Sequence, residues 1–89
     1  MPEEQEAPVG RLVGKVSHFF PHPVVAAIEL TDTLKVGDTI HIKGATSDFT
    51  QTVESMQIEH EQVEQAGPGD SIGVKVVERA REGDEVYVI

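Results

Sequence analysis

A Gly-Asp pair recurs three times in this chain, each time directly before a short run rich in β-branched residues. The pairs are Gly37-Asp38, Gly69-Asp70 and Gly83-Asp84. Glycine supplies the positive φ of a tight turn, and aspartate closes such turns through its side chain. Short apolar runs separated by turn signals are typical of all-β domains. The pattern therefore predicts an all-β domain in which these glycines and aspartates have structural roles.

The apolar runs predict the core, because successive strand residues point to opposite faces. The runs at 24–30, 39–43 and 71–77 are expected to bury alternate residues, and a last strand is expected at 85–89. The inward set is Val24, Ala26, Ile28, Leu30, Ile40, Ile42, Ile72, Val74 and Val76.

The first run, 11–20, is expected to place Leu12, Val16 and Phe20 on one face, together with Gly14 and His18. The ladder is expected to break at Pro21 and Pro23, because proline donates no backbone hydrogen bond.

Residues 53–66 fit two patterns. Their apolar and histidine positions fall at helical spacing, and glutamate and glutamine favour helices. The preceding residues 49–52 favour a strand, which could continue through Met56 and Ile58. Periodicity leaves the choice between helix and strand open.

Length and composition indicate one small domain. The chain has 89 residues and no cysteine. Residues 1–8 are expected to form a disordered acidic tail, and residues 9–89 a single domain. A secreted domain this small usually needs disulfides, so the absence of cysteine favours the cytoplasm. No apolar run suits a transmembrane helix or a signal peptide.

The formal net charge of −9 limits the class of partner. Binding to nucleic acid draws its affinity mainly from lysine and arginine on phosphates, and acidic membrane surfaces repel an acidic protein. We therefore expect weak or no binding to bare nucleic acid and no binding to membranes. A partner protein could supply the missing positive charge.

Motifs that carry chemistry are missing from the sequence. It contains no phosphate-binding glycine loop and no nucleophile elbow. His18 and His22 flank Pro21, which prevents a regular helix from holding both rings on one face. The sequence thus predicts no enzyme activity, no nucleotide, no cofactor and no metal. An activity that uses His60 and nearby carboxylates is a third possibility.

Two segments resemble the second domain of translational GTPases of the elongation factor Tu class, particularly its archaeal and eukaryotic branch. They are 34–42, which contains LKVGD, and 52–73, which contains TVESMQIEHEQVEQAGPGDSIG. The resemblance extends over roughly residues 11–89. It implies a closed six-stranded β-barrel in which residues 53–66 form a strand and a protruding loop.

The same chain is similar to the C-terminal barrel of the collagenase-like peptidase family. This second resemblance is carried by KVGD at 35–38 and DFTQTVESM at 48–56. Some members of that family act in RNA modification. In both families the barrel is joined to a separate catalytic domain, so both resemblances imply an accessory role.

In the elongation factor family the barrel helps to hold the aminoacyl end of transfer RNA. The matching contact loop here contains Gln57, Glu59, His60 and Glu61. The chain departs from that family at 18–23, where HFFPHP replaces a glycine-rich hairpin, and near Ile28, where the family has a basic residue.

The leading hypothesis is a stand-alone, non-catalytic translation-factor-like barrel that binds a protein or ribonucleoprotein partner. The alternative is an accessory subunit of a separately encoded collagenase-like peptidase or RNA-modifying enzyme. Loops on a rigid barrel are the usual place for contacts, and an exposed aromatic ring often anchors an interface. The expected partner-binding residues are Phe19, Phe20, Gln57, Glu59, His60, Glu61 and Glu64. The two phenylalanines leave two possibilities open: one ring is exposed and anchors the partner, or both rings close the mouth of the barrel.

Overall fold

The computed structural model describes residues 10–21, 24–45 and 47–89, and this part of the chain contains ten strands and no helix. The predicted tail at 1–8 and the residues His22 and Pro23 lie outside it. The described residues include no helix long and apolar enough to cross a membrane. The strands are β1 (Arg11–Pro21), β2 (Val24–Leu30), β3 (Leu34–Lys35), β4 (Thr39–Lys43), β5 (Asp48–Thr52), β6 (Met56–Ile58), β7 (Glu61–Val63), β8 (Gln65–Ala66), β9 (Ser71–Lys75) and β10 (Glu85–Val88).

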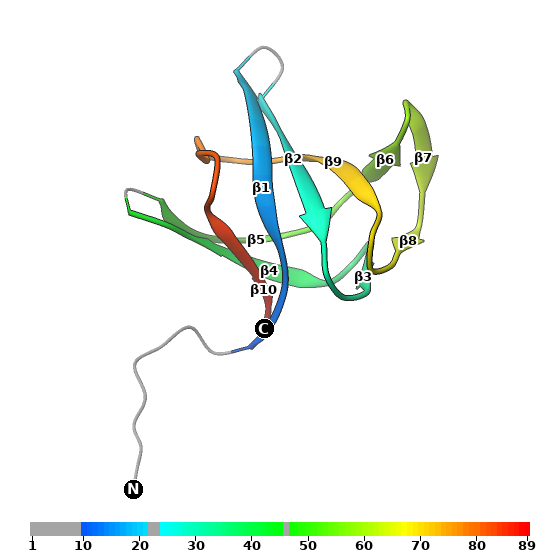
Figure 1. Ribbon diagram of the computed structural model, residues 1–89, viewed down its shortest axis with the longest axis horizontal. Helices are drawn as coiled ribbons and strands as arrows, with labels where there is room; N and C mark the ends of the chain where they lie inside the picture. Colours follow the sequence, from blue (N-terminus) through cyan, green and yellow to red (C-terminus); the bar gives the residue numbers. More distant parts are fainter. Residues whose placement is uncertain (1–9, 22–23, 46) are drawn as a thin grey trace, which may run out of the picture.

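Eight of these strands form one sheet in the order β5-β4-β10-β1-β2-β9-β6-β7, and β3 pairs with β8 separately. Each of the pairings is antiparallel. The long β1–β2 hairpin stands near the middle of this order, and the short β6–β7 hairpin stands at one end (Figure 1). The all-β prediction is therefore confirmed.

The prediction of a closed six-stranded barrel was wrong. The ladder starts at β5 and ends at β7, and these two end strands are not paired with each other. The side chain of Gln51 in β5 instead reaches the end of β9. Its amide nitrogen donates to the carbonyl of Lys75 at 2.9 Å, and its amide oxygen accepts from the backbone nitrogen of Val77 at 2.8 Å. A side chain makes this connection, where closure would need a ladder of backbone hydrogen bonds.

The predicted faces of β1 were also wrong. Val13 and Val16 are buried, whereas Leu12 and Phe20 are exposed. The register of β1 shifts between residues 12 and 14 against β10, and again between residues 16 and 18 against β2. Each irregularity inserts a residue that reverses the alternation of side chains. The ladder also continues through Pro21, which pairs with Val24, so the predicted break at Pro21 did not occur.

The remaining strands bury the side chains that the sequence predicted, although Val24 is only partly buried against the core. Residues 53–66 contain the strands β6, β7 and β8 and no helix. The buried apolar cluster consists of Val13, Val16, Ala26, Ile28, Leu30, Leu34, Ile40, Ile42, Phe49, Val53, Met56, Ala66, Ile72, Val74, Val76, Ala80 and Val86. Burying each of the larger side chains stabilises the fold by about 1.5–3 kcal/mol.

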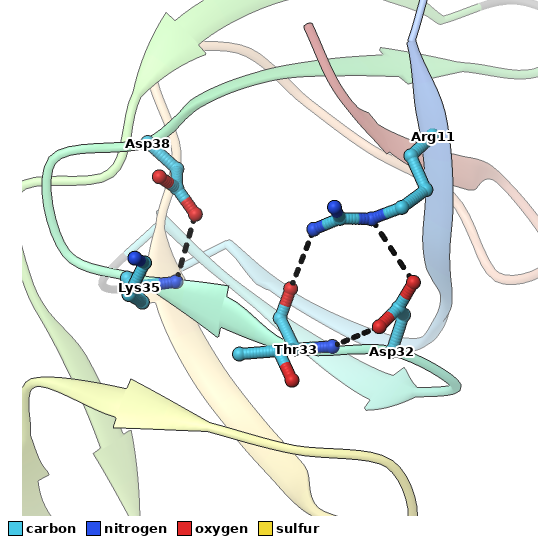
Figure 2. Close-up of polar contacts among 5 residues, drawn as sticks. All are labelled: Arg11, Asp32, Thr33, Lys35 and Asp38. Carbon is cyan, nitrogen blue, oxygen red and sulfur yellow. Dashed lines mark hydrogen bonds and ion pairs between the residues drawn. The ribbon is translucent and has the colours of Figure 1, made fainter.

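The Gly-Asp turns have the geometry that the sequence indicated. Their glycines have φ values of 99°, 90° and 92°. In each turn an aspartate oxygen accepts a hydrogen bond, 2.9 Å long, from the backbone nitrogen three residues earlier. Figure 2 shows the first of these bonds, from the nitrogen of Lys35 to Asp38. The repeated pair is thus one turn structure used three times.

Arg11 ties the start of β1 to the connection between β2 and β3 (Figure 2). Its Nε lies 3.0 Å from Oδ2 of Asp32, and its Nη2 donates to the carbonyl of Thr33 at 3.2 Å. The other oxygen of Asp32 accepts from the backbone nitrogen of Thr33 at 2.7 Å. Such an exposed ion pair contributes at most about 1 kcal/mol, so its main effect is to fix the path of this connection.

Candidate binding groove

An apolar groove lies on the outer side of strands β1, β2, β9 and β6, and its volume is about 450 Å³. This is within the range of about 300–1,000 Å³ that is usual for ligand sites. We call it the Phe20 groove. Its lining residues are Phe20, Val25, Ala27, Gln57, Glu59, His60, Ser71, Ile72 and Gly73.

The strand register explains why this surface is hollow. His18 pairs with Ala27, Ala27 with Gly73, and Gly73 with Gln57, so the four residues form one row across the sheet. The two residues at the centre of the row are the smallest. A β-carbon on Gly73 would lie 3.6 Å from Cγ1 of Val25, which is an ordinary contact. The backbone therefore permits a larger residue at position 73. Because glycine has no side chain, the hollow above this position stays open.

Phe20 forms one wall of the groove. It is 46% exposed near the end of β1, and its ring centroid lies 5.7 Å from that of His18 at an angle of 50°. Of the two possibilities that the sequence left open for the phenylalanines, the structure has the one with an exposed ring. The second bulge of β1 is what turns this ring outward.

The opposite wall is the two-residue turn between β6 and β7, formed by Glu59 and His60. Their φ values are 52° and 70°. This is the left-handed region in which a residue with a β-carbon costs about 1–2 kcal/mol. Hairpin turns with two such residues usually contain Asn-Gly or Asp-Gly. Here the turn instead places a carboxylate and an imidazole at the groove.

The polar side chains of the groove are Gln57, Glu59, His60 and Ser71. Within the described parts of the chain, no hydrogen bond or ion pair engages any of these four side chains. Apart from the imidazole, Glu59 is the only ionisable group in the lining. The groove thus combines an apolar floor with several polar groups that can contact a ligand.

The structure brings together four of the seven predicted contact residues, namely Phe20, Gln57, Glu59 and His60. The other three lie elsewhere. Phe19 packs partly buried against the core, beneath the guanidinium of Arg79 at 5.7 Å. Glu61 is exposed on β7, and Glu64 lines a separate hollow beside Val36. The groove lining thus contains four of the seven residues, and contact of the seven with a partner stays a prediction.

Sequence reasoning missed the floor of the groove, which consists of Val25, Ala27, Ser71, Ile72 and Gly73. A signal was present in β2, whose sequence VVAAIEL is apolar at outward as well as inward positions. Small apolar residues on an outward face indicate a surface that something covers. The position of Gly73 beside Ala27 could not be predicted without the register of β9 against β2.

Charged groups with altered pKa values lie away from the groove. The hydrogen bond from His41, helped by the charge of Lys43, lowers the pKa of Asp48 below its ordinary 3.8. Tyr87 donates a hydrogen bond to Glu85 at 2.7 Å, and this bond raises the pKa of the phenol. Among the described residues, no cluster of three or more carboxylate or imidazole groups could hold a metal ion.

Comparison with known proteins found relatives that are named as a protease and a collagenase. No family model matches the chain. It is 46% identical over 78 residues to an uncharacterised protease of Methanocaldococcus jannaschii, a match that covers 86% of this chain and 19% of that protein. It is 36% identical over 77 residues to a collagenase of Porphyromonas gingivalis, covering 84% of this chain and 21% of the collagenase. The chain thus spans about a fifth of the length of these relatives.

A crystal structure gives the same result for the fold. The C-terminal domain of a protein described as a U32 peptidase, from Geobacillus thermoleovorans, superposes with a TM-score of 0.83 at 20% identity. The match covers 86% of this chain and 98% of that domain. Of the two resemblances in the sequence, these relatives support the collagenase-like one. They do not support the elongation factor resemblance.

Proposed function

We propose that this chain is a non-catalytic binding module of the type found at the C-terminus of collagenase-like U32 peptidases. The observation that carries the proposal is the extent of the similarity. It takes in most of this chain but only about a fifth of each curated relative, and it coincides with a domain that has been solved by itself. Such a segment is a unit that can act beside a catalytic domain.

The Phe20 groove is the proposed contact surface of this module, and a protein is the proposed partner. An exposed aromatic ring, an apolar floor and polar side chains without partners in the described chain are features of binding surfaces. The module holds a polypeptide segment for a collagenase-like catalytic domain and does not cleave it. This is the accessory role that the second resemblance implied.

We also propose that the module works in a reducing compartment such as the cytoplasm. The chain has no cysteine, whereas small secreted domains commonly depend on disulfides. Cell fractionation with an antibody to the chain tests this proposal directly, and recovery from the culture medium would contradict it.

A graft experiment tests the accessory role. The 77-residue matching segment of the Porphyromonas collagenase is deleted, and the deleted enzyme is compared with one in which this chain replaces the segment. We expect the deletion to raise the KM for gelatin and the graft to lower it again. Phe20→Ser in the graft should raise KM with little change in kcat, because binding to the module precedes the chemical step.

Two results would contradict the proposal. The first is a graft that behaves like the deletion although circular dichroism shows that the module is folded. The second is gelatin hydrolysis by the purified chain alone that His60→Ala abolishes, since that result would show catalysis by the module itself.

A further inference from the structure

We infer that the Phe20 groove binds the side chain of an arginine in a polypeptide, with its alkyl part on the floor and its guanidinium at Glu59. This inference rests on the proposed function and adds the chemistry of the contact. It is drawn from the charge of the lining, the shape of the floor and the backbone of the β6–β7 turn.

Charge favours a cation in the groove. Glu59 is the lining carboxylate, and Glu61 follows it by two residues in the same hairpin. Glu29 pairs with the lining residue Ser71 on the adjacent strand. Lys75 follows Gly73 by two residues but lines a different hollow, beside Gln51 and Glu54. An acidic rim on a chain of net charge −9 is complementary to a basic segment.

Shape favours a long, flat side chain. At the centre of the floor Ala27 has only a methyl group and Gly73 has no side chain, and the Phe20 ring lies at one side. Arginine can lay its methylene groups on such a surface while its head remains polar. The several N–H donors of a guanidinium can meet the carboxylate of Glu59 and the amide oxygen of Gln57 together, while the methylene groups extend across the floor toward the Phe20 ring. An ammonium group is a compact charge and matches this arrangement less well.

The backbone of the turn is an independent argument. Glu59 and His60 hold positive φ although neither is glycine, asparagine or aspartate. Backbone strain of this kind often occurs at functional sites, where the side chain in the strained position is needed. Here both side chains line the groove. The chain therefore accepts local strain at the position where the guanidinium is expected to bind.

The groove is unsuited to phosphate groups. Binding of nucleic acid depends on cations at the surface, and the groove lining has no lysine or arginine. A polypeptide with a basic side chain is therefore favoured over a single-stranded nucleic acid. The experiment includes an oligonucleotide so that this alternative has its own outcome.

Nuclear magnetic resonance can test the inference with a small probe. The ¹⁵N-labelled chain is titrated with N-acetyl-arginine-N-methylamide, and with the same compound made from lysine or citrulline. We expect saturable shifts at the amides of Ala27, Gln57 and Gly73, with a dissociation constant on the order of 10⁻³ M for this small ligand. Citrulline keeps the shape of arginine without the charge, and we expect it to bind about tenfold more weakly.

Matched variants assign the contact to the groove. Glu59→Gln should weaken binding of the arginine probe about tenfold. Glu54→Gln is the control, because it makes the same change in net charge and Glu54 lines other hollows, so it should leave binding unchanged. Gly73→Val should abolish binding because its side chain fills the floor, and an amide spectrum with the parent dispersion shows that the variant is folded.

Several outcomes would overturn the inference. They are equal binding of the citrulline probe, shifts that lie outside the groove, and tighter binding of an oligouridylate at the same amides. Concentration-dependent shifts without any probe would identify a second copy of the chain as the occupant.

The graft separates this inference from the proposed function. If the arginine probe fails to bind but Gly73→Val still raises the KM of the graft, the module function stands and the arginine assignment is wrong. If the probe binds and Gly73→Val leaves the KM unchanged, the arginine site stands and the proposed role of the groove is wrong.

Discussion

A β-carbon on Gly44 would lie 1.8 Å from Oδ1 of Asp84, so the observed packing requires glycine at position 44. Asp84 is only 4% exposed. Its Oδ2 accepts a hydrogen bond from the backbone nitrogen of Arg81 at 2.9 Å, and its carbonyl accepts one from Val16 at 2.8 Å. The carboxylate therefore cannot turn away from position 44 without breaking the turn that leads into β10.

We expect Gly44→Ala to lower the free energy of unfolding by about 1–3 kcal/mol, because the methyl group must displace this carboxylate. Asp84→Ala should lower it by about 1–3 kcal/mol through loss of the acceptor for the Arg81 nitrogen. In the double variant the clash is absent, so the combined loss should be smaller than the sum. Urea unfolding of the four proteins measures this coupling, and additivity within about 0.5 kcal/mol would show that the two residues do not interact.

The turn before β9 contains a matched pair of glycines. Gly69 has a φ of 90°, whereas the φ of Gly67 is outside the left-handed region, and a β-carbon on either would have no atom within 4 Å. Gly69→Ala should therefore destabilise the fold by about 1–2 kcal/mol through backbone strain alone. Gly67→Ala, the control, should change the free energy of unfolding by less than about 0.5 kcal/mol. Equal effects in urea unfolding would contradict this account.

The sequence predicted those parts of the fold that depend on local chemistry. The Gly-Asp turns and the inward residues of β2, β4 and β9 follow from side-chain types and alternation. The face of β1 could not be predicted in this way. One irregularity lies in its register against β10 and the other in its register against β2, and neither register follows from the alternation of residues in β1. The missing closure likewise depends on where distant strand ends meet, which alternation does not encode.

Only part of the site could be predicted, again because local chemistry is visible in the sequence and strand register is not. Glu59 and His60 stood out as polar residues of an expected loop, and the choice between Phe19 and Phe20 depended on the second bulge of β1. The groove floor joins Ala27 to Gly73, which are far apart in sequence. Only the strand register brings these two together, so the local pattern of β2 could indicate its own part of the floor but not the part that β9 supplies.

The contact between His41 and Asp48 predicts that the free energy of unfolding depends on pH in the acid range. The hydrogen bond from His41 lowers the pKa of Asp48 below 3.8 in the folded protein. A lowered carboxyl pKa stabilises the fold above the ordinary pKa, and this contribution is lost as the pH falls through the lowered value. Asp48→Asn should therefore be less stable than the parent at pH 6 and should approach it below pH 3.8. A difference between the two in urea unfolding that is constant from pH 6 to about pH 2 would contradict the linkage.

The side-chain amide of Gln51 connects β5 to the chain after β9 through two hydrogen bonds. The bond made by its nitrogen and the bond made by its oxygen can be tested separately. Gln51→Leu removes both hydrogen bonds and should cost about 1–2 kcal/mol. It should also speed hydrogen exchange of the Val77 amide, whose acceptor is the Gln51 oxygen. Gln51→Glu keeps that acceptor and loses the donor to Lys75, so protection of Val77 should persist. Equal exchange rates at Val77 in both variants would show that the oxygen does not hold this segment.

The β6–β7 turn should yield a variant that is more stable and binds less well. Glu59→Asn together with His60→Gly gives the residues that a two-residue hairpin turn with two positive φ values prefers. We expect the free energy of unfolding to rise by about 1–2 kcal/mol because the strain at both positions is relieved. The same variant lacks the carboxylate at the groove rim, and its affinity for the arginine probe should fall at least about tenfold.

The single variant His60→Gly separates these two effects. It relieves the strain at φ 70° and keeps Glu59, so it should be more stable than the parent and should lose less affinity for the probe than the double variant. Thermal unfolding and the probe titration together give the result. A gain in stability from both variants, with the larger loss of binding when Glu59 is also replaced, would place the strain in the backbone and the main recognition in the carboxylate. If His60→Gly is no more stable than the parent, the left-handed turn carries no strain, and the backbone argument for the groove is lost.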